Sequence, residues 1–115
     1  MPRELLILSR TAPELGVFVD AGAAIAPDLR VRVLDGGAVT EVVDPRGHAV
    51  LSVQVPELVE NPAEVARLAP WSSLSAPVWW TEAWAPWGER GDVGVAIARA
   101  FAEASGAQLS VEDGS

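Results

Sequence analysis

LRVRVLDGGAVTEVVDPRGHAVLSVQV, residues 29–55, decides the fold class. In its first part apolar and charged residues alternate, so we expect Leu29, Val31 and Val33 to face the core while Arg30 and Arg32 face outward. Two turn signals follow: one is rich in glycine, which accepts the positive φ of hairpin turns, and the other has a proline that presets φ. A three-stranded antiparallel meander is therefore predicted, with strands at 29–33, 38–43 and 49–55 and turns at 35–37 and 44–47.

The segments on either side of the meander predict two long helices and further strands. Residues 4–9 are a continuous apolar run, which is typical of a strand in the middle of a sheet. Thr11 and Glu14 predict a capped helix start, and Asp92 predicts the cap of a second long helix that ends at Gly106. Also expected are a short helix capped by Asn61, a loop at 71–77, a strand at 78–85 and an edge strand at 108–111.

This element order, β-α-β-β-β-(short α)-β-α-(β), predicts the architecture. Hairpin-sized connections dominate the middle of the chain, so the sheet should be mostly antiparallel. We expect an α+β fold with four to six strands and two main helices packed on one face. The length of 115 residues suits a single α+β domain over 1–115, with 112–115 as a flexible tail.

Composition excludes several classes of function. Residues 1–56 carry five arginines and seven acids, whereas residues 57–115 carry three arginines and nine acids, which gives the net charge of −8. A nucleic-acid-binding protein needs a basic stripe against phosphates, and the chain offers none. The apolar run near the N-terminus is too short for a signal peptide or a membrane span, so we expect a cytoplasmic protein without membrane contact. Arginine without lysine, together with abundant alanine, is typical of a high-GC bacterium.

Catalytic and cofactor motifs are weak. The chain has no cysteine and one histidine, His48, which we expect to be an exposed turn residue. Ser72, Ser73 and Ser75 lack the glycines of a nucleophile elbow. Gly88–Gly91 precedes a helix, but Glu89 and Asp92 would repel a phosphate there. We therefore predict no metal, no cofactor and no catalytic residue, and we favour a function other than catalysis.

Tryptophan carries the one distinctive signal. All five tryptophans lie between residues 71 and 87. If 78–85 is a strand, its two-residue period places Trp80, Glu82 and Trp84 on one face and Trp79 on the other. The Trp79 face carries no charge, so we expect it to face the core. The opposite face then presents Trp80, Glu82 and Trp84, with Trp71 or Trp87 joining them from the flanking loops.

Three interpretations of that face follow. Loops or the C-terminal segment cover the indoles, or the indoles form a protein–protein surface, or they line a small-ligand cleft. We favour a non-enzymatic interaction module that binds a protein partner or itself, as a homodimer, through Trp80, Glu82, Trp84, Trp71 and Trp87. The alternative is a ligand-binding or enzymatic domain in which Glu82, buried among indoles with a raised pKa, is the acid–base candidate. A flat patch would indicate the first function and a concave site the second.

Overall fold

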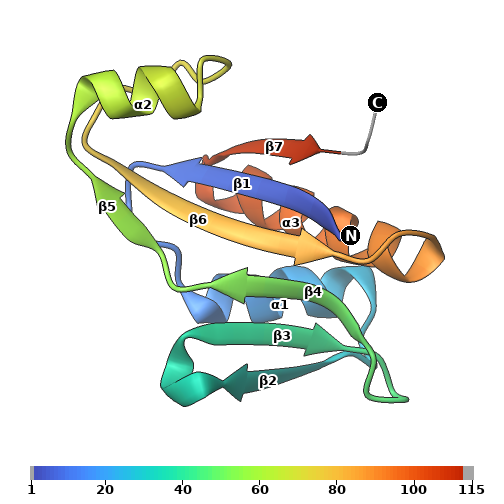
Figure 1. The fold of residues 1–115 in the computed structure, drawn as a ribbon. Coiled ribbons are helices and arrows are strands. Elements are labelled where there is room, and N and C mark those ends of the chain that lie inside the picture. Colours follow the sequence, from blue (N-terminus) through green and yellow to red (C-terminus); the bar gives the residue numbers. More distant parts are fainter. Residues whose placement is uncertain (1, 113–115) are drawn as a thin grey trace.

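The computed structural model describes residues 2–112 and shows an α+β fold (Figure 1). Seven strands form one antiparallel sheet, and three α-helices accompany it. The strands are β1 (Arg3–Ser9), β2 (Arg30–Leu34), β3 (Val39–Val43), β4 (Ala49–Gln54), β5 (Glu57–Val59), β6 (Val78–Ala85) and β7 (Gln108–Glu112). The helices are α1 (Leu15–Ile25), α2 (Pro62–Leu68) and α3 (Glu89–Ser105), and a 3₁₀ turn covers Asp35–Gly37.

The strand order in the sheet is β2-β3-β4-β6-β1-β7, and β5 pairs with β6 beyond the end of β4. The prediction of an antiparallel α+β fold is confirmed, but four to six strands was too few. The additional strand is β5. The pairing of β4 with β6 ends at Val53. After Pro56, which has no N–H to donate, the three residues of β5 pair with β6 again, with Glu57 opposite Trp80.

The apolar run near the N-terminus forms the strand β1, which lies between β6 and β7. Leu5 and Ile7 belong to the main core, whereas Leu8 belongs to a second apolar cluster on the other side of the sheet. Burial on both faces explains why this segment does not alternate between apolar and polar residues. Glu112 is the last residue of β7, and 113–115, the rest of the predicted tail, lie outside the described residues.

Helices α1 and α3 lie on one side of the sheet (Figure 1). Phe18 of α1 and Phe101 of α3 stack with a centroid separation of 3.8 Å and an interplanar angle of 5°. The short helix α2 packs on the opposite side, where its Val65 meets Leu8 of β1 and Val78 of β6. We call this side of the sheet, away from α1 and α3, the open face.

Two predicted helix caps were wrong and two other termini were confirmed. Helix α1 begins after Glu14, whose side chain makes no capping hydrogen bond, so the predicted pairing of Thr11 and Glu14 is absent there. Helix α3 begins after Gly88, whose φ of 87° suits glycine, so Asp92 lies within the first turn rather than at the cap. The Asn61 side chain accepts a hydrogen bond from the N–H of Ala63, and Gly106 ends α3 with a φ of 67°.

The predicted burial of the strand at 29–33 holds for Leu29, which is partly buried against the main core, but was wrong for the two valines of β2. Val31 is 38% exposed and Val33 is 55% exposed. Helix α3 packs against β4, β6, β1 and β7, whereas β2 lies at the edge of the sheet (Figure 1). The apolar side of this strand therefore extends beyond the helix that would cover it.

No helix among residues 2–112 combines the length and the apolar character needed to cross a lipid bilayer. The longest, α3, has 17 residues and contains several charged side chains.

The turn between β3 and β4 is organised by the carboxylate of Asp44. Backbone N–H groups of His48 (2.9 Å) and Arg46 (3.0 Å) donate to its Oδ1. Its Oδ2 lies 3.4 Å from Nε of Arg90 in α3. The hydrogen bond from His48, more than any other contact, holds the pKa of Asp44 below its ordinary value.

We expect Asp44→Asn to change how stability depends on pH. The folded carboxylate binds a proton less readily than the unfolded one, so its contribution to stability is complete at neutral pH and is lost as the pH falls below the ordinary aspartate pKa of about 3.9 and through the lowered pKa. The stability difference between the wild type and Asp44→Asn should therefore shrink over this range. Urea unfolding at a series of pH values measures it, and parallel curves for the two proteins would contradict the prediction.

Candidate functional site

Strand β6 places its side chains as the two-residue period predicts. Thr81, Ala83 and Ala85 are fully buried, and the two alanines belong to the main core under the helices. Trp80, Glu82 and Trp84 alternate with them on the open face, where Glu82 is exposed and both indoles are half-buried. Trp79, on the helix side, is half-buried beside β5. The choice of the uncharged face as the core side therefore holds.

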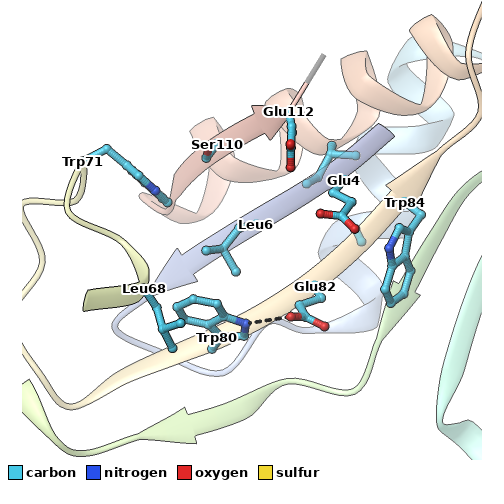
Figure 2. Close-up of a pocket in the computed structure, with 11 residues that line it drawn as sticks. Glu4, Leu6, Leu68, Trp71, Trp80, Glu82, Trp84, Ser110 and Glu112 are labelled. Carbon is cyan, nitrogen blue, oxygen red and sulfur yellow. Dashed lines mark hydrogen bonds between the residues drawn. The ribbon is translucent and has the colours of Figure 1, made fainter. Parts of the chain in front are cut away.

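A groove lies on the open face, with a volume of about 290 Å³ (Figure 2). Strands β6, β1 and β7 form its floor, and α2 and the loop after it supply Leu68 and Trp71 at one end. The residues that line the groove are Glu4, Leu5, Leu6, Leu68, Trp71, Trp80, Glu82, Ala83, Trp84, Ser110 and Glu112.

Three carboxylates reach the groove from three different strands. Glu4 of β1 lies opposite both Trp84 of β6 and Glu112 of β7, and Leu6 of β1 lies opposite Glu82. All three glutamates are exposed, and no arginine is among the described residues that line the groove. Like charges on neighbouring strands repel, so this part of the sheet holds a concentrated negative potential.

Three indoles complete the groove. Nε1 of Trp80 donates to Oε1 of Glu82 over 3.4 Å, which orients the carboxylate along the strand (Figure 2). The ring of Trp80 also packs against the apolar cluster under α2. Trp84 projects from the same side of β6 near Glu4, and Trp71 stands at the other end, 43% exposed.

The loop that carries Trp71 is tied to strand β7. The hydroxyl of Ser72 donates to Oε1 of Gln108 over 2.6 Å, and Nε2 of Gln108 donates to the hydroxyl of Ser73 over 2.6 Å. The N–H of Ser73 donates to the same Oε1. These hydrogen bonds fix the loop against the sheet edge beside the groove.

Trp87, the remaining predicted site residue, does not line the groove. Its ring lies 5.4 Å from the guanidinium carbon of Arg3, which points to the helix side of the sheet. Arg3 is nearly buried and donates to the carbonyl oxygens of Pro86 and Gly88 and to Oδ1 of Asp92 at 2.8 Å. This contact joins β1 to the start of α3, which is a structural role.

At the β2 end of the open face, the negative charge of a glutamate is balanced by an arginine. Arg32 of β2 donates to Oε1 of Glu41 from Nε (3.0 Å) and Nη2 (2.7 Å), and the hydroxyl of Ser52 donates to Oε2 of the same glutamate. Arg32, Glu41 and Ser52 lie in one row across β2, β3 and β4. The negative charge on this face is therefore concentrated over β6, β1 and β7.

The groove does not provide the acid–base arrangement considered for Glu82. That arrangement assumed a carboxyl group buried among the indoles, whereas Glu82 is exposed. Within residues 2–112, no three histidine or acidic side chains are arranged to hold a metal ion. His48 is exposed on the β3–β4 turn, with Nδ1 at 3.7 Å from Oδ2 of Asp44.

Comparisons with other proteins give no guide to what the groove binds. Neither a protein family, nor a curated protein, nor a solved structure matches this chain. The chemistry of the groove itself is therefore the basis for a functional proposal.

Proposed function

We propose that the chain is a protein-interaction module whose groove binds a positively charged segment of a partner protein. One observation carries this proposal: the indoles of Trp71, Trp80 and Trp84 and the carboxylates of Glu4, Glu82 and Glu112 line the same groove. A guanidinium or ammonium group is attracted both by the face of an indole and by a carboxylate. The groove offers both within reach of one cationic side chain.

The size of the groove supports a side chain rather than a large ligand. Its volume of about 290 Å³ lies just below the range of about 300–1,000 Å³ for small-molecule sites. The concave shape is the one expected of the ligand-binding alternative rather than of a flat interaction patch. A protruding arginine or lysine of a partner fits such a cleft, so that side chain takes the place of a small ligand. The half-buried indoles beside it then supply apolar contact area for the rest of the segment.

Charge favours a basic partner over a second copy of this chain. In a two-fold symmetric dimer the same surface is used on both subunits, so the groove would bring its glutamates close to those of its copy. The net charge of −8 adds to that repulsion. A basic partner would instead be drawn to the groove, and more strongly at low salt.

Titration of the tryptophan fluorescence with an arginine-rich octapeptide, blocked at both ends, tests the proposal. A neutral peptide with glutamine in place of arginine is the reference ligand. We expect Trp84→Ala to weaken binding of the arginine peptide about tenfold, because it removes a cation–π contact and apolar area. Glu82→Gln should weaken it about threefold, since exposed charge pairs contribute modestly.

Two control variants separate the groove from the rest of the surface. Glu103→Gln removes one negative charge from an exposed position on α3, and Trp87→Ala removes an exposed indole outside the groove. Both should leave the affinity for the peptide unchanged. Equal affinity for the neutral peptide, or equal losses in Glu82→Gln and Glu103→Gln, would refute the proposal. A dimer in sedimentation that Trp84→Ala dissociates would favour self-association instead.

A further inference from the structure

The two ends of the groove differ in chemistry. Strand pairing sets the side chains of the open face in rows that run across β6, β1 and β7. The first row consists of Trp84, Glu4 and Glu112. Glu82 begins the second row, which lies two residues, or about 7 Å, further along the strands. One indole and the three carboxylates of the groove therefore lie within two neighbouring rows, which we call the acidic end.

The other end of the groove is apolar. Trp80 begins the third row, and Leu68 of α2 and Trp71 of the loop after it stand beside it (Figure 2). Leu68 is 40% exposed and Trp71 is 43% exposed, so both present apolar surface to solvent. The side chain of Gln108 holds the loop through its hydrogen bonds to Ser72 and Ser73, so the fold itself positions this surface. We call Leu68, Trp71 and Trp80 the apolar end.

The distance between the two ends matches the repeat of an extended peptide. In an extended chain, side chains on one side recur every second residue, about 7 Å apart. The rows begun by Glu82 and Trp80 are separated by the same two residues of β6. Leu6 forms the half-buried floor between the ends, and the methylene stem of a long cationic side chain can pack on it. A segment that runs along the strands can therefore fill both ends with side chains two positions apart.

We infer that the partner segment is extended and carries a basic residue and an apolar residue two positions apart. The inference rests on the proposed function, because the basic residue is the one whose cation the groove binds. That cation lies among the carboxylates of the acidic end, against the indole of Trp84. The apolar side chain covers Leu68 and Trp71 and removes their exposed surface from water. A charge in that position would lose hydration without gaining a partner.

Two blocked octapeptides of serine and threonine, each with one arginine and one leucine, test the spacing. In the first peptide the leucine lies two positions after the arginine. In the second it is adjacent to the arginine and so points the opposite way in an extended chain. We expect the first to bind about fivefold more tightly in titrations followed by amide chemical shifts. Replacing its arginine by glutamine should weaken binding about tenfold.

Three variants assign each side chain of the peptide to one end of the groove. Leu68→Ala should remove the preference for the first peptide. Leu58→Ala, at a position of β5 that is 46% exposed and outside the groove, should keep it. Glu4→Gln should weaken both peptides equally, about threefold, and also keep the preference.

The outcomes separate this inference from the proposed function. Equal affinities of the two peptides for the wild type, or a preference that Leu58→Ala removes as fully as Leu68→Ala, would overturn the inference and leave the proposed function standing. Binding that does not depend on the arginine would refute the proposed function, and the inference with it.

Discussion

Gly94→Ala is expected to lower the free energy of unfolding by about 3 kcal/mol. A Cβ atom at this position would lie 1.8 Å from the carbonyl oxygen of Val50 and 2.7 Å from its carbonyl carbon. Both are backbone atoms of the β4 strand, so no side-chain rotation relieves the overlap. Helix α3 would have to move away from the sheet and loosen the core on that side.

The matched control is the same substitution at Gly22, in the last turn of α1. A Cβ there has nothing within 4 Å, so Gly22→Ala should raise the free energy of unfolding by about 0.5–1 kcal/mol through helix propensity alone. Urea unfolding of both variants measures the contrast. Equal effects in the two helices would show that α3 does not approach β4 as closely as described.

Phe101→Ala should cost about 4 kcal/mol of stability. The side chain of Phe101 is fully buried and stacks on Phe18, so its removal leaves a cavity between α3 and α1 and also ends the ring contact. If the alanine variant does not fold, Phe101→Leu, which keeps most of the apolar volume, should cost about 1–2 kcal/mol.

Val33→Ala provides the comparison for Phe101. Val33 is apolar but 55% exposed at the sheet edge, so its truncation should change the free energy of unfolding by no more than about 0.5 kcal/mol. Thermal unfolding of Phe101→Ala, Phe101→Leu and Val33→Ala tests the order of effects. A loss at Val33 as large as that at Phe101 would contradict the described position of the core.

The sequence predicts the class of the fold because its signals are local. Alternation in residues 29–55 and the two turn signals are sufficient for an antiparallel meander. Strand β5 could not be predicted in this way, since three residues after Pro56 carry no periodicity. They become a strand because β6, eight residues long, extends beyond the end of β4. The exposure of Val33 likewise depends on where α3 ends on the sheet.

The candidate site was predictable to the same extent. The two-residue period of β6 places Trp80, Glu82 and Trp84 on one face, and the lack of charge on the other face indicates which side is buried. Glu4 and Glu112 were missed because they join the groove only through the register of β1 with β6 and β7. No pattern within either segment contains that register.

The position of β1 in the sheet has a consequence for synthesis of the chain. Leu5 pairs with Ala83 and with Val111, so β1 is synthesised long before either of the strands that flank it. At about 5–20 residues per second, Leu5 waits roughly 4–16 seconds for Ala83. During that interval one of the most apolar segments of the chain has no strand beside it. We therefore expect the nascent polypeptide, rather than the finished protein, to be the form most exposed to aggregation.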